Sequence, residues 1–444
     1  MKQYDVVIIG IGTAGQTAAQ ALSDAGKSVA MVDYGPVGGT CALRGCQPKK
    51  YFVVNTQLVA ETRALSGYGV AGQVHTDWPA LQAFKRDFTD PIPDGVVKSL
   101  REDGIDVFVE RAAFTEPGKL ILEPSGTVLQ ASHFIIATGA QSRPLSIPGG
   151  ELAATSDDFL ELESLPESII FIGGGYISLE FAFIAAIAGS RVTVLQRGPR
   201  MLPLFPASLV DPVVEAGQKL GIQFVTDADV SEIVATGSGF SVRTEEKDSY
   251  DAAWVMSAIG RVPNIEKLGL EKIGLDTESR GIVVDDYLQT SADGVYAIGD
   301  CAATKQLAPI SDMEAQIAAA NIITPQSQKA VRDAIPSVVF TNPQIASVGI
   351  TREEAEAGNL DVVVKSGDGG RWPSSRRLRG AVVRYETIAD AATGQLLGAH
   401  IVSPHAGEQI NVFTLAIRNK VTTEEFATIP WAYPTYTSDA KYMV

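Results

Sequence analysis

Two segments of the chain repeat the same order of a short buried strand, a glycine turn and an apolar helix. Residues 4–9 form a β-branched apolar run, a glycine-rich turn follows, and an alanine-rich helical pattern extends to Gly26. A second apolar run over residues 28–32 completes a strand–helix–strand unit. The order returns with a strand at residues 168–172, the helical segment GGGYISLEFAFIAAIAG and a strand at residues 191–195. The pattern predicts an α/β protein with two Rossmann-like dinucleotide-binding domains.

The last quarter of the chain has a different pattern. Strands are expected at residues 337–340, 362–365 and 381–385, and helices are expected to begin at Arg352 and Gly407. Between the two glycine units, PSGTVLQASHFIIATGA and DSYDAAWVMSAIGRVPN are typical of meander strands that end in a glycine. The carboxy-terminal pattern therefore predicts a separate α+β domain.

Charge and cysteine content narrow the class of protein. The 444 residues include 52 acidic and 36 basic side chains, a formal charge of −16. Such a surface repels phosphate backbones and anionic lipids, so neither nucleic acid nor membrane is an expected partner. Three cysteines are too few for a disulfide scaffold. We therefore expect a cytoplasmic protein in which any cysteine pair is catalytic.

The first glycine turn has the spacing of a dinucleotide fingerprint. Gly10, Gly12 and Gly15 give GxGxxG directly after a strand, and Asp33 ends the following strand. Gly10 permits a tight turn, Gly12 lets the backbone approach a pyrophosphate, and Gly15 lets helix and strand pack closely. The helix amino terminus attracts the phosphates, and Asp33 is expected to accept hydrogen bonds from a ribose. Nucleotide binding is favoured over a plain turn.

The second fingerprint consists of Gly173, Gly175 and Ser178. Gln196 stands where a carboxylate would bind a ribose 2′-hydroxyl, and Arg197 and Arg200 follow it. Arginine pairs with a 2′-phosphate that a carboxylate would repel, so we expect NADPH rather than NADH. The alternative is that both arginines are solvated loop charges.

A cysteine pair lies in GGTCALRGCQPKK. Cys41 and Cys46 stand five positions apart, a spacing over which a regular helix rises about 7.5 Å, at or beyond the reach of a disulfide. A bridge therefore needs an irregular backbone, which Gly45 permits. Pro48 fits the start of a helix, and a thiol there beside Lys49 is expected to have a lowered pKa. The alternatives are two buried apolar cysteines or a zinc pair, but the remaining cysteine and histidines lack zinc-finger spacing, so no metal site is expected.

GGTCALRGCQPKK resembles the redox motif of the FAD-dependent pyridine nucleotide disulfide oxidoreductases, the family of glutathione reductase, dihydrolipoamide dehydrogenase and mercuric reductase. Further motifs of that family follow in order, namely the first glycine fingerprint, the ATG turn, GGGYISLE, AIGRVPN, TSADGVYAIGD and FTNPQIASVGIT. The resemblance covers nearly the whole chain and implies an FAD domain split around an NADPH domain. The expected ranges are 1–145 for the first part of the FAD-binding domain, 146–262 for the NAD(P)H-binding domain, 263–332 for the second part of the FAD-binding domain and 333–444 for the interface domain.

The resemblance also implies roles for individual residues. Cys46 would be the charge-transfer thiolate near the flavin, and Cys41 the interchange thiol that attacks the substrate. Lys49 and Glu180 would form an ion pair beside flavin N5, and Tyr176 would cover the nicotinamide pocket until NADPH displaces it. Cofactor contacts are expected from Gly10, Gly12, Gly15, Asp33, Gly39, Thr40, Thr138, Gly139, Asp300, Gly173, Gly175, Tyr176, Arg197, Arg200, Gly260 and Arg261.

The carboxy-terminal tail departs from the family pattern. Disulfide reductases of the family donate a histidine and a glutamate across the dimer, whereas this chain has Tyr433 and Ser438 at those positions, with Asp439 adjacent. A phenol with its ordinary pKa of about 10 is a weak base at pH 7, although it can donate a hydrogen bond. Mercuric reductases also lack that histidine, but their carboxy-terminal cysteine pair is absent because no cysteine follows Cys301.

These observations predict a homodimeric flavoenzyme with FAD and NADPH as cofactors. Electrons would pass from NADPH through FAD to the Cys41–Cys46 disulfide and then to a small-molecule or protein disulfide. One alternative is a reductase of metal ions, quinones or other electrophiles, and another is a non-catalytic flavoprotein that senses redox state. The arginine-rich segment GRWPSSRRLRG is either a solvated strand edge or a surface that attracts an anionic substrate.

Overall fold

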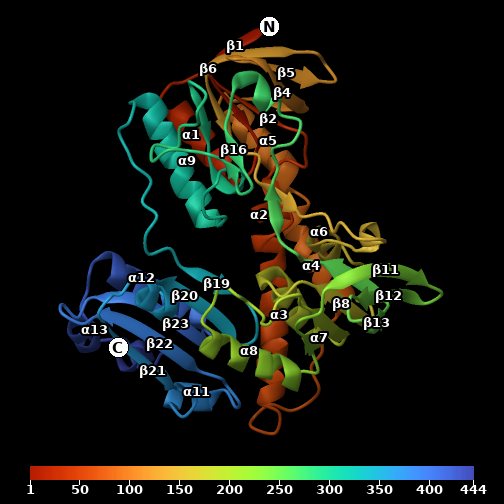
Figure 1. The fold of residues 1–444 in the computed structure, drawn as a ribbon, viewed down its shortest axis with the longest axis vertical. Helices are drawn as coiled ribbons and strands as arrows, with labels where there is room; N and C mark the ends of the chain where they lie inside the picture. Colours follow the sequence, from red (N-terminus) through yellow and green to blue (C-terminus); the bar gives the residue numbers. More distant parts are fainter. The chain divides into compact units, whose positions relative to one another are not determined.

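The computed structural model describes residues 1–444 and divides the chain into two compact units (Figure 1). The first unit consists of Met1–Tyr51, Gln82–Arg143 and Gly260–Val331, and the second of Phe52–Leu81, Pro144–Ile259 and Arg332–Val444. Each unit is therefore assembled from three separate stretches of sequence.

A seven-stranded sheet forms the centre of the first unit. Its order is β3-β2-β1-β6-β5-β4, and β18 pairs with β6. The strands are β1 (Lys2–Ile9), β2 (Val29–Asp33), β3 (Asp106–Val109), β4 (Arg111–Glu116), β5 (Lys119–Glu123), β6 (Val128–Ile136) and β18 (Val295–Ala297). The pairs β1–β2, β1–β6, β2–β3 and β6–β18 are parallel, while β4 and β5 form an antiparallel meander. Residues 6–9 of β1 are at most 4% exposed, as expected for a parallel strand covered on both faces.

Helices and small ribbons complete the first unit. The helix α1 packs beside α9 against the sheet (Figure 1), and apolar side chains such as Ala18 and Ala315 lie in the shared core. The remaining elements include the short helix α2, which contains Cys41, and two small ribbons. Their bounds are α1 (Thr13–Asp24), α2 (Gly39–Leu43), α5 (Ile92–Glu102), β7 (Ala140–Ser142), β15 (Arg261–Pro263), η2 (Leu270–Ile273), β16 (Thr277–Glu278), β17 (Gly281–Ile282), η3 (Gly299–Cys301) and α9 (Ala308–Ile323). Two further helices, α3 (Cys46–Ala64) and α4 (Trp78–Thr89), are divided between the two units, with the boundaries after Tyr51 and before Gln82.

The second unit contains a four-stranded parallel sheet with the order β10-β9-β8-β14 and an antiparallel meander β11-β12-β13. The predicted strands at residues 168–172 and 191–195 are confirmed with the same bounds as β8 and β9. The elements are η1 (Gly150–Leu152), α6 (Ser156–Leu160), β8 (Ser168–Ile172), α7 (Tyr176–Ala188), β9 (Arg191–Leu195), α8 (Ala207–Lys219), β10 (Gln223–Val225), β11 (Val230–Thr236), β12 (Gly239–Thr244), β13 (Ser249–Ala252) and β14 (Trp254–Ser257). All five residues of β8 are buried because helices flank the sheet.

A five-stranded antiparallel sheet, in the order β19-β20-β23-β22-β21, also belongs to the second unit. Apolar residues of α12 such as Ile410 pack on one face, and α8 packs on the other (Figure 1). The elements are β19 (Ser337–Val339), β20 (Gln344–Gly349), α10 (Arg352–Ala357), β21 (Val362–Asp368), α11 (Pro373–Arg377), β22 (Arg384–Asp390), β23 (Leu396–Ser403), α12 (Ala406–Arg418), α13 (Thr423–Thr428) and η4 (Thr437–Tyr442). The predicted α/β class with a carboxy-terminal α+β portion is confirmed.

One predicted strand was placed wrongly. The strand expected at residues 381–385 begins only at Arg384 and continues to Asp390. Before it, the N–H of Ala381 donates to the carbonyl of Leu378, which closes a turn at Gly380 with φ of 76°. The apolar run AVV at residues 381–383 therefore leads from this turn into the strand and is not part of the strand itself. No helix is both long and apolar enough to cross a bilayer.

Candidate active site

The two cysteines lie on either side of a break between two helices. Cys41 is in α2, and Cys46 is the first residue of α3. At the break Arg44 has φ of −138°, and its N–H donates to the carbonyl of Thr40 at 2.8 Å. A Cβ at Gly45 would lie 3.0 Å from the same carbonyl oxygen. The irregular backbone predicted between the cysteines is therefore present, and it brings the thiols within hydrogen-bonding distance of each other.

The two free thiols have opposite electrostatic environments. The hydrogen bond from Cys41 and, to a lesser degree, the Lys49 ammonium together lower the pKa of Cys46 to about 7, against the opposing effect of burial. Cys46 also begins α3, where the helix dipole favours an anion. The hydrogen bond to Cys46 and burial raise the pKa of Cys41. A reduced pair therefore holds its negative charge on Cys46 and its proton on Cys41.

Two further groups lie beside Cys41. The Thr13 hydroxyl hydrogen-bonds with Cys41, and the negative charge of Asp312 is one of the interactions that raise the pKa of the Cys41 thiol. The Asp312 carboxylate accepts a hydrogen bond of 2.9 Å from the hydroxyl of Thr17. Neither Thr13 nor Asp312 was predicted from the sequence. The available signal was a pair of carboxylates, Asp312 and Glu314, in the first turns of a helix that has no other charged residue.

The first glycine fingerprint forms a narrow backbone cradle. Gly10 has φ of 110°, and a Cβ there would lie 2.2 Å from the carbonyl oxygen of Ala137. A Cβ at Gly39 would lie 2.5 Å from the Cα of Gly12. Only glycine permits these approaches. The fingerprint, the segment Gly39–Thr40 and the ATG turn therefore meet at the amino terminus of α1, where unpaired N–H groups can bind a pyrophosphate.

Asp33 supports this loop from the end of β2. Its carboxylate accepts hydrogen bonds from the N–H of Ile11 at 2.7 Å and of Gly35 at 3.1 Å. Each carboxylate oxygen can accept more than one hydrogen bond, so these contacts leave capacity for a ribose hydroxyl. The structure thus adds a loop-fixing contact to the predicted ribose contact.

The ATG turn is joined to the AIGRVPN motif. The Asn264 amide donates to the carbonyl of Thr138 at 3.3 Å, and the N–H of Asn264 donates to the carbonyl of Gly139 at 2.9 Å. Arg261 donates to the carbonyl of Ala140, and the carbonyl of Gly260 accepts from the N–H of Arg143. These residues from distant parts of the sequence therefore lie together in the first unit, as the cofactor prediction requires.

The turn η3 carries Asp300. Burial raises the pKa of Asp300, and the positive charge of Arg261 partly opposes that effect. Glu314 on α9 fixes the turn, because its carboxylate accepts a 2.8 Å hydrogen bond from the N–H of Gly299. Cys301 is 0% exposed, and its thiol donates to the carbonyls of Ile136 and Ile298. Burial raises the pKa of Cys301 to about 11, so this thiol is a packed side chain and a poor nucleophile.

The second fingerprint repeats the first in the second unit. Gly173 has φ of 109°, and a Cβ there would lie 2.5 Å from the carbonyl oxygen of Ala258. No atom would contact a Cβ at Gly175, so its backbone is open to a ligand. The side-chain oxygen of Gln196 accepts a 2.7 Å hydrogen bond from the N–H of Gly174. This contact corresponds to the one between Asp33 and Ile11, but it uses a neutral amide.

The other predicted site residues of the second unit differ in exposure and in their hydrogen bonds. Tyr176, the first residue of α7, is 50% exposed. Glu180 is buried in α7, and its carboxylate accepts a 2.8 Å hydrogen bond from the N–H of Phe340. Arg197 is exposed, whereas Arg200 donates to the carbonyl of Pro203 and so also holds its loop. Because Lys49 belongs to the first unit and Glu180 to the second, their ion pair stays a prediction.

The tail exposes the residue at the predicted histidine position and buries the residue at the predicted glutamate position together with its neighbour. Tyr433 is 75% exposed, whereas Ser438 and Asp439 are buried. Asp439 accepts a hydrogen bond from the hydroxyl of Ser374, and the rings of His405 and Tyr436 lie 4.1 Å apart. Asp439 therefore anchors the tail, and the phenol of Tyr433 is among the exposed side chains of the tail.

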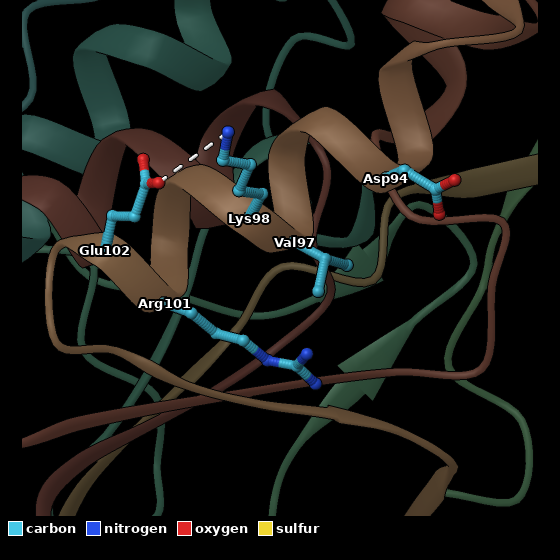
Figure 2. A pocket seen from close by; sticks show the side chains of 5 residues that line it. All are labelled: Asp94, Val97, Lys98, Arg101 and Glu102. Atoms are coloured by element: carbon cyan, nitrogen blue, oxygen red, sulfur yellow. Dashed lines mark ion pairs between the residues drawn. The ribbon is translucent and has the colours of Figure 1, made fainter.

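A surface hollow on α5 lies elsewhere in the first unit. Figure 2 shows its five lining side chains, with Lys98 and Glu102 joined by a 3.8 Å ion pair. The other three are Asp94, Val97 and Arg101. All five come from one helix face, and neither cysteine is among them. The hollow is therefore separate from the candidate redox site.

Comparison with known proteins places the chain among redox enzymes. The pyridine nucleotide-disulphide oxidoreductase model matches residues 4–321, and the dimerisation domain of those enzymes matches residues 335–444. A dihydrolipoyl dehydrogenase of Chlamydia pneumoniae is 30% identical, covering 98% of this chain and 95% of its own. A glutathione reductase of Burkholderia cepacia is 31% identical, covering 97% and 96%.

A solved structure is similar over the same length. The Cu(II) complex of the HOCl-induced flavoprotein disulfide reductase RclA from Escherichia coli has a TM-score of 0.90 and 27% sequence identity, and the match covers 100% of this chain and 99% of that chain.

Proposed function

The chain belongs to the pyridine nucleotide-disulphide oxidoreductases, and on that premise we propose that it is an NADPH-dependent flavoenzyme that reduces a disulfide through Cys41 and Cys46. One observation supports this proposal most strongly. The two thiols are within hydrogen-bonding distance, and their pKa values are shifted in opposite directions. Thiol–disulfide exchange proceeds through a thiolate, and the lowered pKa of Cys46 suits it to attack a mixed disulfide formed on Cys41.

The residues around the first fingerprint fit FAD. The close approach of Gly12 and Gly39, the amino terminus of α1 and the position of Asp33 suit a dinucleotide. The hydroxyl of Thr304, in the loop between Asp300 and α9, is buried without a hydrogen-bond partner, and a bound group can satisfy it. When bound, FAD supplies the two-electron chemistry that takes a hydride from NADPH and delivers an electron pair to the cysteine disulfide.

The cysteines then act in a fixed order. Reduction of their disulfide by two electrons and one proton leaves a thiolate on Cys46 and a thiol on Cys41. Cys41 loses its proton and attacks one sulfur of the acceptor disulfide, forming a mixed disulfide and releasing one acceptor thiol, which takes the proton. Cys46 then attacks Cys41 and releases the second acceptor half, which is protonated from solvent. The Cys41–Cys46 disulfide is thereby formed again.

The second fingerprint supports NADPH as the electron donor. The amide of Gln196 repeats the loop contact of Asp33 without its negative charge, so a 2′-phosphate would meet no carboxylate there. Arg197 is exposed and available to pair with that phosphate.

We also propose that the enzyme is a homodimer, supported by the match to the family's dimerisation domain. In the dimer Tyr433 would take the place of the family's tail histidine. It is exposed at the predicted position and can donate a hydrogen bond to the leaving thiolate.

Anaerobic titration of the purified holoenzyme with NADPH tests the proposal. The flavin should bleach and a long-wavelength absorbance from the Cys46 thiolate should appear, while Cys46→Ser should lack that absorbance. Cys41→Ser should keep flavin reduction but lose disulfide turnover. A flavin that NADPH does not reduce, or full disulfide turnover by Cys41→Ser, would refute the proposed function. A panel of disulfides then identifies the acceptor.

Reduction of a thiophilic metal ion is the second candidate function. It is favoured by the similarity to RclA, which was solved as a Cu(II) complex, and by the absence of the tail histidine. An activity assay distinguishes the two functions. NADPH oxidation that requires Cu(II) and is not supported by any disulfide would favour metal-ion reduction.

A further inference from the structure

The charged groups around the two cysteines differ. The Lys49 ammonium and the Asp300 carboxylate both act on Cys46, whereas the Asp312 carboxylate acts on Cys41. In the proposed function Cys41 is the sulfur that meets the acceptor. The Asp312 charge therefore acts at the sulfur with which the acceptor disulfide exchanges.

Hydrogen bonds fix this carboxylate beside the cysteine. Thr13 and Thr17 are one turn apart on α1 and so share a face of that helix. Thr13 hydrogen-bonds with Cys41, and Thr17 donates to Asp312 at 2.9 Å, which joins α1 to α9. Ser311, the neighbour of Asp312, lies against the η3 turn, since a Cβ at Gly299 would be 3.0 Å from its hydroxyl oxygen. Asp312 is therefore held in place, with its side chain only partly covered.

The two helices beside Cys41 offer no positive charge. Neither α1 (TAGQTAAQALSD) nor α9 (APISDMEAQIAAANII) contains a lysine or an arginine. The exposed or half-buried side chains that accompany Thr13 and Thr17 on α1 include the neutral amides of Gln16 and Gln20. An anionic acceptor would find no cation on these helices, and it would be repelled by Asp312.

We propose that Asp312 sets the charge preference of the enzyme, so that Cys41 reduces cationic disulfides in preference to anionic ones. This inference rests on the proposed disulfide reductase function and adds the class of substrate. A cationic acceptor is attracted to the carboxylate as its sulfur reaches Cys41, whereas a dicarboxylate is repelled. The cations Arg44, after α2, and Lys49, at the start of α3, are present in the wild type and in both variants of the test below. A difference in charge preference between those proteins is therefore due to the substituted carboxylate.

Three small disulfides that differ mainly in charge test the inference. They are cystamine with two positive charges, 2-hydroxyethyl disulfide with none, and 3,3′-dithiodipropionate with two negative charges. The NADPH-driven kcat/KM of the holoenzyme should follow that order at low ionic strength and converge in high salt. Asp312→Asn keeps an acceptor oxygen for Thr17, and it should lower the ratio of the cystamine to the dithiodipropionate value by about tenfold.

Asp24→Asn is the matched control. It removes the same charge from the far end of α1, where Gln20 donates to Asp24, about 16 Å along the helix from Thr13. This variant should keep the wild-type ratio. An equal ratio in the wild type, Asp312→Asn and Asp24→Asn would overturn the inference.

Alkylation of Cys41 provides a readout that needs no turnover. In NADPH-reduced holoenzyme, Asp312→Asn should raise the rate with the anion iodoacetate relative to neutral iodoacetamide, and Asp24→Asn should not. If none of the three disulfides is reduced while this alkylation difference appears, the disulfide function fails and the charge selection at Cys41 stands. If disulfides are reduced without any difference between the variants in either measurement, only the charge selection fails.

Discussion

The side-chain oxygen of Gln196 accepts a 2.7 Å hydrogen bond from the backbone N–H of Gly174. The Asp33 carboxylate makes the same bond, also of 2.7 Å, to the N–H of Ile11 in the other fingerprint. Both residues therefore brace a glycine loop, and they differ in the charge that they place there. Loop geometry and cofactor choice are thus separable properties of this position.

Gln196→Glu should reverse the nucleotide preference without unfolding the loop. The glutamate can accept the bond from Gly174, but its charge would repel a 2′-phosphate and bind a free 2′-hydroxyl. We expect the ratio of kcat/KM for NADPH to that for NADH to fall by at least about tenfold. Gln218→Glu, at an exposed position of α8, adds the same charge as a control and should leave the ratio unchanged. An unchanged ratio in Gln196→Glu would remove this position from cofactor selection.

The Cys46 thiolate should titrate near neutral pH. Because the pKa of Cys46 is lowered to about 7, the charge-transfer absorbance of the NADPH-reduced enzyme should be present above that pH and fade below it. Cys41→Ala removes the hydrogen bond that lowers this pKa most, so its midpoint should move upward. Cys41→Ser retains a hydroxyl donor and should shift less. Equal midpoints in the wild type and Cys41→Ala would show that the contact does not stabilise the thiolate.

Glu314→Ala should weaken flavin retention. It leaves the N–H of Gly299 without its carboxylate acceptor in a buried turn, which costs about 1–3 kcal/mol. The loss falls on the turn that carries Asp300, so flavin fluorescence should appear at a lower temperature on heating. Glu314→Gln retains an acceptor oxygen and should resemble the wild type more closely. A release temperature unaffected by either substitution would contradict the assigned positioning role.

His400 should make the protein less stable in mild acid. Its ring is buried, with Nδ1 2.6 Å from the Ser347 hydroxyl and Nε2 3.0 Å from the carbonyl of Ile350. Burial lowers the pKa of His400, so the folded state favours the neutral ring. Its contribution to stability is present above the unfolded pKa of about 6.5 and is lost as the pH falls through the lower folded pKa.

Melting temperatures between about pH 7 and pH 5 check this prediction. The wild type should lose up to about 1.36 kcal/mol of stability per pH unit more than His400→Gln in that window. The exposed His75 serves as the control, and His75→Gln should keep the wild-type slope. Identical slopes in all three proteins would show that His400 takes up no extra proton on unfolding.

Tyr433→Phe should slow the oxidative half-reaction alone. The phenol is proposed to donate a hydrogen bond to the leaving thiolate, so its loss should lower disulfide turnover by about tenfold or more. Flavin reduction by NADPH, followed by stopped flow, should be unchanged. Tyr436→Phe is a matched control, because this phenol lies against His405. Disulfide turnover that Tyr433→Phe leaves intact would exclude the phenol from the reaction.

Local features of the sequence predicted much of the fold and the residues of the site that lie within short motifs. The strands at residues 168–172 and 191–195 were predicted correctly because buried parallel strands are short apolar runs followed by turns. The break between Cys41 and Cys46 followed from helix geometry alone. The strand at 381–385 was misplaced because the apolar run at residues 381–383, which precedes the strand, resembles its start.

Long-range contacts could not be predicted in this way. The hydrogen bond between Thr17 and Asp312 joins residues 295 positions apart, and nothing in either segment alone indicates its partner. The same holds for Glu314 and Gly299, and for the bond from Phe340 to Glu180. Such contacts depend on how distant elements pack against one another in the folded chain.

Burial of Cys301 makes the enzyme suitable for selective bioconjugation. Because this thiol is enclosed and hydrogen-bonded to two carbonyls, a maleimide dye applied to the folded protein should couple only at Cys41 and Cys46. The number of dyes attached per folded chain would then equal the number of reduced thiols at Cys41 and Cys46. The oxidised enzyme, in which these cysteines form a disulfide, should stay unlabelled. Labelling with such a dye therefore measures the oxidation state of the cysteine pair by fluorescence, without the need to replace Cys301.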